Sequence, residues 1–128
     1  MEQRSVQTSK RKSNGGVRAS HQPPQQIEVG YLEVKVETDA DSVARSVYNT
    51  GSSVFGTYDE RTGTITLDVT VPLRVQQESL MHELLHAIIK QTGLQWEEEK
   101  EETVIRTLSP FILMMLRDNP DFVAWLSK

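Results

Sequence analysis

The sequence predicts a small α+β domain, in which a short antiparallel or mixed sheet is followed by helices. Three observations lead to this fold class. Apolar residues alternate with polar ones in much of residues 27–69, which is the period of half-buried strands. From Leu73 onward they recur every three or four residues, which is the period of a helix. A length of 128 residues and a hydrophobic content of 37% suit one modest core and exclude two. Strands followed by helices are typical of an α+β domain.

Residues 1–26 are expected to form a disordered basic tail that precedes the domain at residues 27–128. The tail holds five Lys or Arg residues and one acidic residue, and it is rich in Ser, Gln, Gly and Pro. It has almost no apolar surface to bury, so folding could not offset its loss of conformational entropy. Its tripeptide KRK is a weak indication of nucleic-acid contact, and a solvated tail is the better interpretation.

The first strand is expected within residues 27–37, IEVGYLEVKVE, where apolar and polar residues alternate up to Val36. The following segment is ambiguous. Asp39 or Asp41 could cap a short helix that ends at Val47, because the side chain of an N-cap aspartate accepts a hydrogen bond from the first helical turn.

Two further strands are expected at residues 54–58 and 64–69, which are rich in β-branched and aromatic residues. They flank the sequence DERTG, whose glycine suits a hairpin turn. Pro72 ends the second strand, because proline has no N–H to donate to a sheet.

Three helices complete the predicted domain. The first spans about residues 75–91 and ends at Gly93, a natural C-cap. The second begins at the acidic cluster of residues 97–99, whose charges suit the positive end of a helix dipole. Pro110 would kink or end it. A last short helix is expected at residues 121–126.

The first helix carries the motif H-E-x-x-H, formed by His82, Glu83 and His86. Two histidines four positions apart lie on one helix face, where both imidazoles can reach the same ion. Zinc prefers such nitrogen ligands, and Glu83 is then placed to take a proton from a zinc-bound water. The alternative is a helix whose two histidines are satisfied by ordinary hydrogen bonds. The apolar neighbours on both sides favour the metal, because buried imidazoles need partners.

The third zinc ligand has to be a carboxylate. The chain has no cysteine, and its only other histidine, His21, belongs to the tail. Helical spacing favours Glu101, which shares a face with the apolar residues Val104, Ile105 and Leu108. Glu102 and Glu98 are the alternatives.

The series GTYDERTGTITLD, ESLMHELLHAI and EETVIRTLSPFILMMLRDNPDFVAWL resembles small bacterial and phage-encoded metallopeptidases of the ImmA/IrrE type. These are compact zincins with a gluzincin-like site, and the resemblance covers about residues 27–128. It implies a minimal zincin-like domain in which His82 and His86 are zinc ligands, Glu83 is the catalytic base and Glu101 is the third ligand. It also implies an edge strand above the metal, for which residues 64–69 are the candidate.

The expected function is a Zn²⁺-dependent metallopeptidase that hydrolyses peptide bonds of an intracellular protein, such as a repressor or regulator. The alternative is a non-enzymatic phage or bacterial regulatory protein that keeps a structural zinc site. The basic tail favours this alternative, as do Leu85, where many members have glycine, and Val104–Ile105, where the longer family form has alanine and a polar residue. No apolar run approaches the length of a membrane span, and no secretory signal is evident, so a cytoplasmic location is expected, in the host if the gene belongs to a phage.

Overall fold

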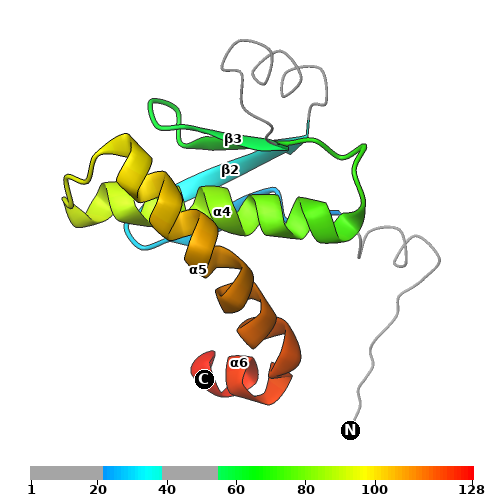
Figure 1. Ribbon diagram of the computed structural model, residues 1–128. Coiled ribbons are helices and arrows are strands. Elements are labelled where there is room, and N and C mark those ends of the chain that lie inside the picture. The colour runs from blue at the N-terminus through cyan, green and yellow to red at the C-terminus, as the bar shows by residue number, and fades with distance from the viewer. Residues whose placement is uncertain (1–21, 39–54) are drawn as a thin grey trace, which may run out of the picture.

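The computed structural model describes residues 22–38 and 55–128. Residues 1–21 of the expected tail and the expected helix ending at Val47 lie outside the described residues. The strands form one four-stranded sheet. Figure 1 shows helix α4 (Leu73–Thr92) packed along the sheet and helix α5 (Glu98–Asp118) crossing α4. The chain ends with helix α6 (Pro120–Leu126). The predicted α+β class and the mixed character of the sheet are confirmed.

The sheet has the strand order β1-β2-β4-β3. Its strands are β1 (Gln26–Val29), β2 (Leu32–Thr38), β3 (Gly56–Asp59) and β4 (Thr64–Leu67). The pairs β1–β2 and β3–β4 are antiparallel hairpins, whereas the central pair β2–β4 is parallel. The prediction that β4 is an edge strand was therefore wrong. Within the described residues the edge strands are β1 and β3.

The strand expected within residues 27–37 is confirmed as β2, but the segment before it forms a separate strand, β1, because the chain turns back at Gly30. This residue has a φ of 62°, which glycine adopts at little cost. Two hydrogen bonds of the Gln91 carboxamide on α4 stabilise the turn. Its Oε1 accepts a hydrogen bond from the backbone N–H of Tyr31 at 2.7 Å, and its Nε2 donates to the carbonyl of Val29 at 2.6 Å. A β-carbon at Gly30 would lie 2.6 Å from that Oε1.

The helices begin and end close to the predicted positions. Helix α4 starts directly after Pro72 and ends at Gly93, whose φ of 81° is the left-handed conformation of a C-cap. Helix α5 continues through Pro110 to Asp118, so the proline does not end it. At its far end Arg117 donates a hydrogen bond of 2.8 Å to Gln77, which ties α5 to the first turns of α4.

The core lies between the sheet and α4. Its buried members are five strand residues and one helix residue: Val29, Val34, Val36, Ile65, Leu67 and Ala87. Strand β3 contributes Gly56 to this face, where a β-carbon would lie only 3.1 Å from Leu67 Cδ2. The missing side chain lets β3 approach α4 closely. Among the described residues no helix is long and apolar enough to cross a membrane.

Candidate metal centre

His82 and His86 lie one turn apart on α4, and both rings point toward α5. The ring centroids are 5.1 Å apart, with an interplanar angle of 62°. The side chains are only 20% and 18% exposed. Burial lowers the pKa of His82, and the negative charge of Glu102 opposes this. The two imidazoles are therefore close enough to share one partner.

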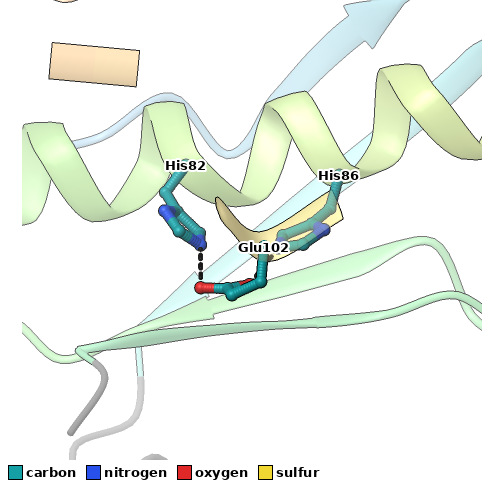
Figure 2. A group of neighbouring side chains, drawn as sticks. All are labelled: His82, His86 and Glu102. Carbon is teal, nitrogen blue, oxygen red and sulfur yellow. Dashed lines mark hydrogen bonds and ion pairs between the residues drawn. The ribbon is translucent and has the colours of Figure 1, made fainter. Parts of the chain in front are cut away.

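That partner is Glu102, from the second turn of α5. Its Oε2 lies 3.0 Å from Nε2 of His82, and its Oε1 lies 2.9 Å from Nε2 of His86. Figure 2 shows the carboxylate between the two rings, next to the β3–β4 hairpin. One ligand atom from each residue lies within 4.8 Å of the others. Burial alone would raise the pKa of Glu102, but the nearby His82 and His86 hold it below its usual range.

The hydrogen bonding of His86 fits a cation at this point. Its Nδ1 lies 2.6 Å from Oε2 of Glu101, while its Nε2 faces Glu102. A neutral imidazole has one N–H, so one of the two nitrogens presents a lone pair to a carboxylate oxygen. That contact is repulsive unless a second proton or a metal ion lies between the atoms. Two imidazole nitrogens and one carboxylate oxygen are also the ligands that zinc prefers, so the residues present fit this metal.

Glu101 is buried, as the helical spacing predicts, with an exposure of 5%. Its carboxylate lies on the Nδ1 side of His86, and its Oε1 is 3.8 Å from the Lys90 ammonium. Of the three carboxylates considered from the sequence, the one between both Nε2 atoms is Glu102. Glu98 is exposed and lines the cleft one turn earlier. The geometry thus favours Glu102 as the third ligand of a metal ion. Glu101 contacts Nδ1 of His86 and is placed to orient that ring.

Glu83 lies beside this cluster, and only 8% of it is exposed. Burial raises the pKa of its carboxyl to about 7, although the neighbouring His86 partly opposes the effect. The close approach of β3 contributes to this burial, because a β-carbon at Gly56 would lie 3.5 Å from Glu83 Cγ. No hydrogen bond to the Glu83 carboxylate is formed by residues 22–38 or 55–128. A buried carboxyl without such a partner can exchange protons near neutral pH.

The cluster opens into a cleft of about 1340 Å³ between β3, α4 and α5. Phe55 and the first three residues of β3 form one wall. Tyr58 and Arg106 also lie on its walls. The guanidinium of Arg106 is 3.2 Å from Oε2 of Glu102, which places its charge next to the cluster.

The contribution of β3 was missed by the sequence reasoning. A glycine that follows Phe55 in a strand-like run indicates a close backbone approach, and this pattern could have identified Gly56. Comparison of the chain with protein-family models, curated proteins and solved structures gives no match. The functional interpretation therefore depends on the geometry of the site.

Proposed function

We propose that the protein is a zinc-dependent metallopeptidase that hydrolyses peptide bonds of an intracellular protein. One observation carries the proposal. A buried carboxyl with a pKa near neutrality lies beside two imidazoles and a carboxylate that converge at an open cleft. Perturbed titratable groups next to such a donor set are typical of hydrolytic sites.

In this proposal His82, His86 and Glu102 hold the zinc ion. Zinc bound there would lower the pKa of a coordinated water to about 7 and polarise the carbonyl of a scissile peptide bond. Glu101 fixes the ring of His86 through its contact with Nδ1, and Arg106 holds the Glu102 carboxylate from the far side. Three protein ligands leave a fourth position open, as catalytic sites require and structural sites do not.

Glu83 acts as the general base in this scheme. The Glu83 carboxyl lies beside the cluster and lines the cleft, so it can accept a proton from the attacking water and return it to the leaving amine.

The wall of the cleft formed by β3 suits an extended substrate. Within the described residues β3 pairs only with β4, so its outer edge offers backbone N–H and C=O groups to another strand. A peptide segment that pairs with this edge would run along the cleft past the cluster. The edge strand, the motif helix and the ligand-bearing helix together support a zincin-like arrangement of the ImmA/IrrE type. A repressor or regulator is the substrate class that this resemblance implies.

The test separates metal binding from hydrolysis. Purified wild-type protein should hold one zinc ion per chain, and the double variant His82→Ala, His86→Ala should hold none. The variant His21→Ala is the matched control, since it removes the histidine that lies outside the motif. A full equivalent of zinc in the double variant would overturn the metal assignment.

Hydrolysis is tested with Glu83→Gln at equal zinc occupancy. Glutamine keeps the shape of the side chain but cannot take a proton, so cleavage of cellular proteins should fall by about 10²–10⁴-fold, the typical contribution of a general base. Cleavage sites are found by comparing protein termini in cells that express either form. Equal cleavage by both forms would exclude Glu83 as the base. No cleavage by zinc-loaded wild type would leave the structural-zinc regulator as the function.

A further inference from the structure

The second half of α5 exposes a stripe of large apolar side chains. They are Leu108, Phe111, Met114 and Met115, with exposures between 41% and 67%. At 100° per residue these four positions lie within an arc of about 120° on the helix. Leu108 and Met115 border the flank that contains the buried residues Glu101, Ile105 and Ser109, whereas Phe111 and Met114 lie farther round the helix. Packing of that flank therefore does not cover Phe111 and Met114.

Helix α6 adds further exposed apolar side chains. It exposes Phe122, Val123, Trp125 and Leu126, and none of its residues is buried. A seven-residue helix is too short to be stable in water by itself, so it needs packing on one side. Among the described elements its main contact is with α5. Figure 1 shows α6 beyond the end of α5 and away from the sheet, while Arg117 near that end of α5 still contacts Gln77 of α4.

The exposed area is large for a monomer. Taking roughly 200 Å² for a fully exposed large side chain, the exposed fractions of these eight residues correspond to about 800 Å². The largest apolar patch on a typical monomer covers about 300–600 Å². One partner in a standard protein interface buries about 800 Å². The surface thus has the size of one side of a stable interface.

We propose that this surface, formed by the eight residues on α5 and α6, is covered by the same surface of a second copy of the chain. Its aromatic and methionine content resembles that of permanent interfaces, whereas transient ones are more polar. A partner that covers the surface permanently has to be present wherever the protein is made. A second copy of the chain meets this condition. Two-fold dimers are also the commonest oligomers.

The flanking charges are self-complementary. The chain from Phe111 to its end carries two basic and two acidic residues, namely Arg117, Lys128, Asp118 and Asp121. A two-fold axis can place basic groups of one copy against acidic groups of the other, so the surface can meet itself without net repulsion. The same balance disfavours an anionic membrane surface, which attracts helices rich in Lys and Arg.

The experiment measures the mass of the full chain in solution by light scattering and sedimentation. The wild type should have twice the monomer mass of 14.5 kDa. Phe111→Glu with Trp125→Glu should raise the dimer dissociation constant by at least about 100-fold, because aromatic residues dominate such interfaces. Tyr31→Glu is the matched control. It removes an aromatic side chain that is 97% exposed in the β1–β2 turn, outside the proposed surface, and it should leave the dimer intact.

A second measurement covers the case in which the double variant does not fold. The chain has no cysteine, so a single Val123→Cys substitution on α6 should give a disulfide-linked dimer under mild oxidation, whereas Tyr31→Cys should not. A monomeric wild type across micromolar concentrations would overturn the proposal, as would dimers that tolerate both glutamate substitutions. Binding of the wild type to phosphatidylserine vesicles that competes with dimerisation would assign the surface to a membrane instead.

Discussion

Glu83→Gln should change the pH dependence of stability in the metal-free protein. Burial raises the pKa of the Glu83 carboxyl from 4.5 to about 7. The folded protein therefore binds this proton more tightly than the unfolded chain does. The free energy of unfolding falls as the pH rises from about 4.5 to about 7, because ionisation then places a charge in a buried position. Since one pKa unit corresponds to about 1.4 kcal/mol, the loss can reach roughly 3 kcal/mol.

Glutamine cannot ionise, so the free energy of unfolding of the variant does not fall in this way as the pH rises. We expect Glu83→Gln to gain up to roughly 3 kcal/mol over wild type between pH 4.5 and pH 8, relative to their difference at pH 4.5. The assay is urea unfolding at a series of pH values with a zinc chelator present. Glu78→Gln is the matched control, because Glu78 is an exposed residue of the same helix and should follow wild type. A constant difference between Glu83→Gln and wild type across this range would refute the reasoning.

Two further pairs of variants test the site and the fold. Glu102→Gln should weaken zinc binding by more than Glu101→Gln, for which about 10–100-fold is expected from the loss of a group that orients a ligand. Competition with a chromophoric chelator measures the zinc affinity of each variant. A larger loss of affinity in Glu101→Gln would identify Glu101 as the third ligand instead. Gly30→Ala should destabilise more than Gly63→Ala, although both glycines have φ near +65°. Only at Gly30 does the new β-carbon meet the carboxamide of Gln91. Loss of the hydrogen bonds from Gln91 to Tyr31 and Val29 should lower the free energy of unfolding by about 1 kcal/mol beyond the backbone strain that both variants share. Equal unfolding midpoints for the two variants would contradict this.

Local periodicity was sufficient to predict the helices. Helix α4 and its end at Gly93 follow from the apolar spacing and from the conformational freedom of glycine. Pro110 shows the limit of such reasoning. A proline removes one backbone hydrogen bond, yet α5 continues past it to Asp118. The turn at Gly30 was missed because Gln91, which holds it, lies far away in the sequence.

The pairing of the motif histidines was predictable, because a spacing of four residues on one helix places both rings on the same face. The carboxylate that lies between them was not predictable, because its position depends on how α5 crosses α4. Helical spacing correctly placed Glu101 in the core, but a core-facing carboxylate reaches Nδ1 of His86, and the neighbouring Glu102 reaches both Nε2 atoms. The environment of Glu83 was equally hidden, because it depends on a strand that comes earlier in the chain.

The parallel pairing of β2 with β4 has a consequence for the order in which the protein assembles. It joins residues about 30 positions apart, and loop closure slows such contacts relative to local ones. The residues from His82 to Glu102 belong to two consecutive helices and need no strand to meet. In the proposed function the helix pair would bind its ion early, whereas the burial of Glu83 is completed only when the β3–β4 hairpin packs on α4. A newly made or partly opened chain would then hold metal before the general base is in place.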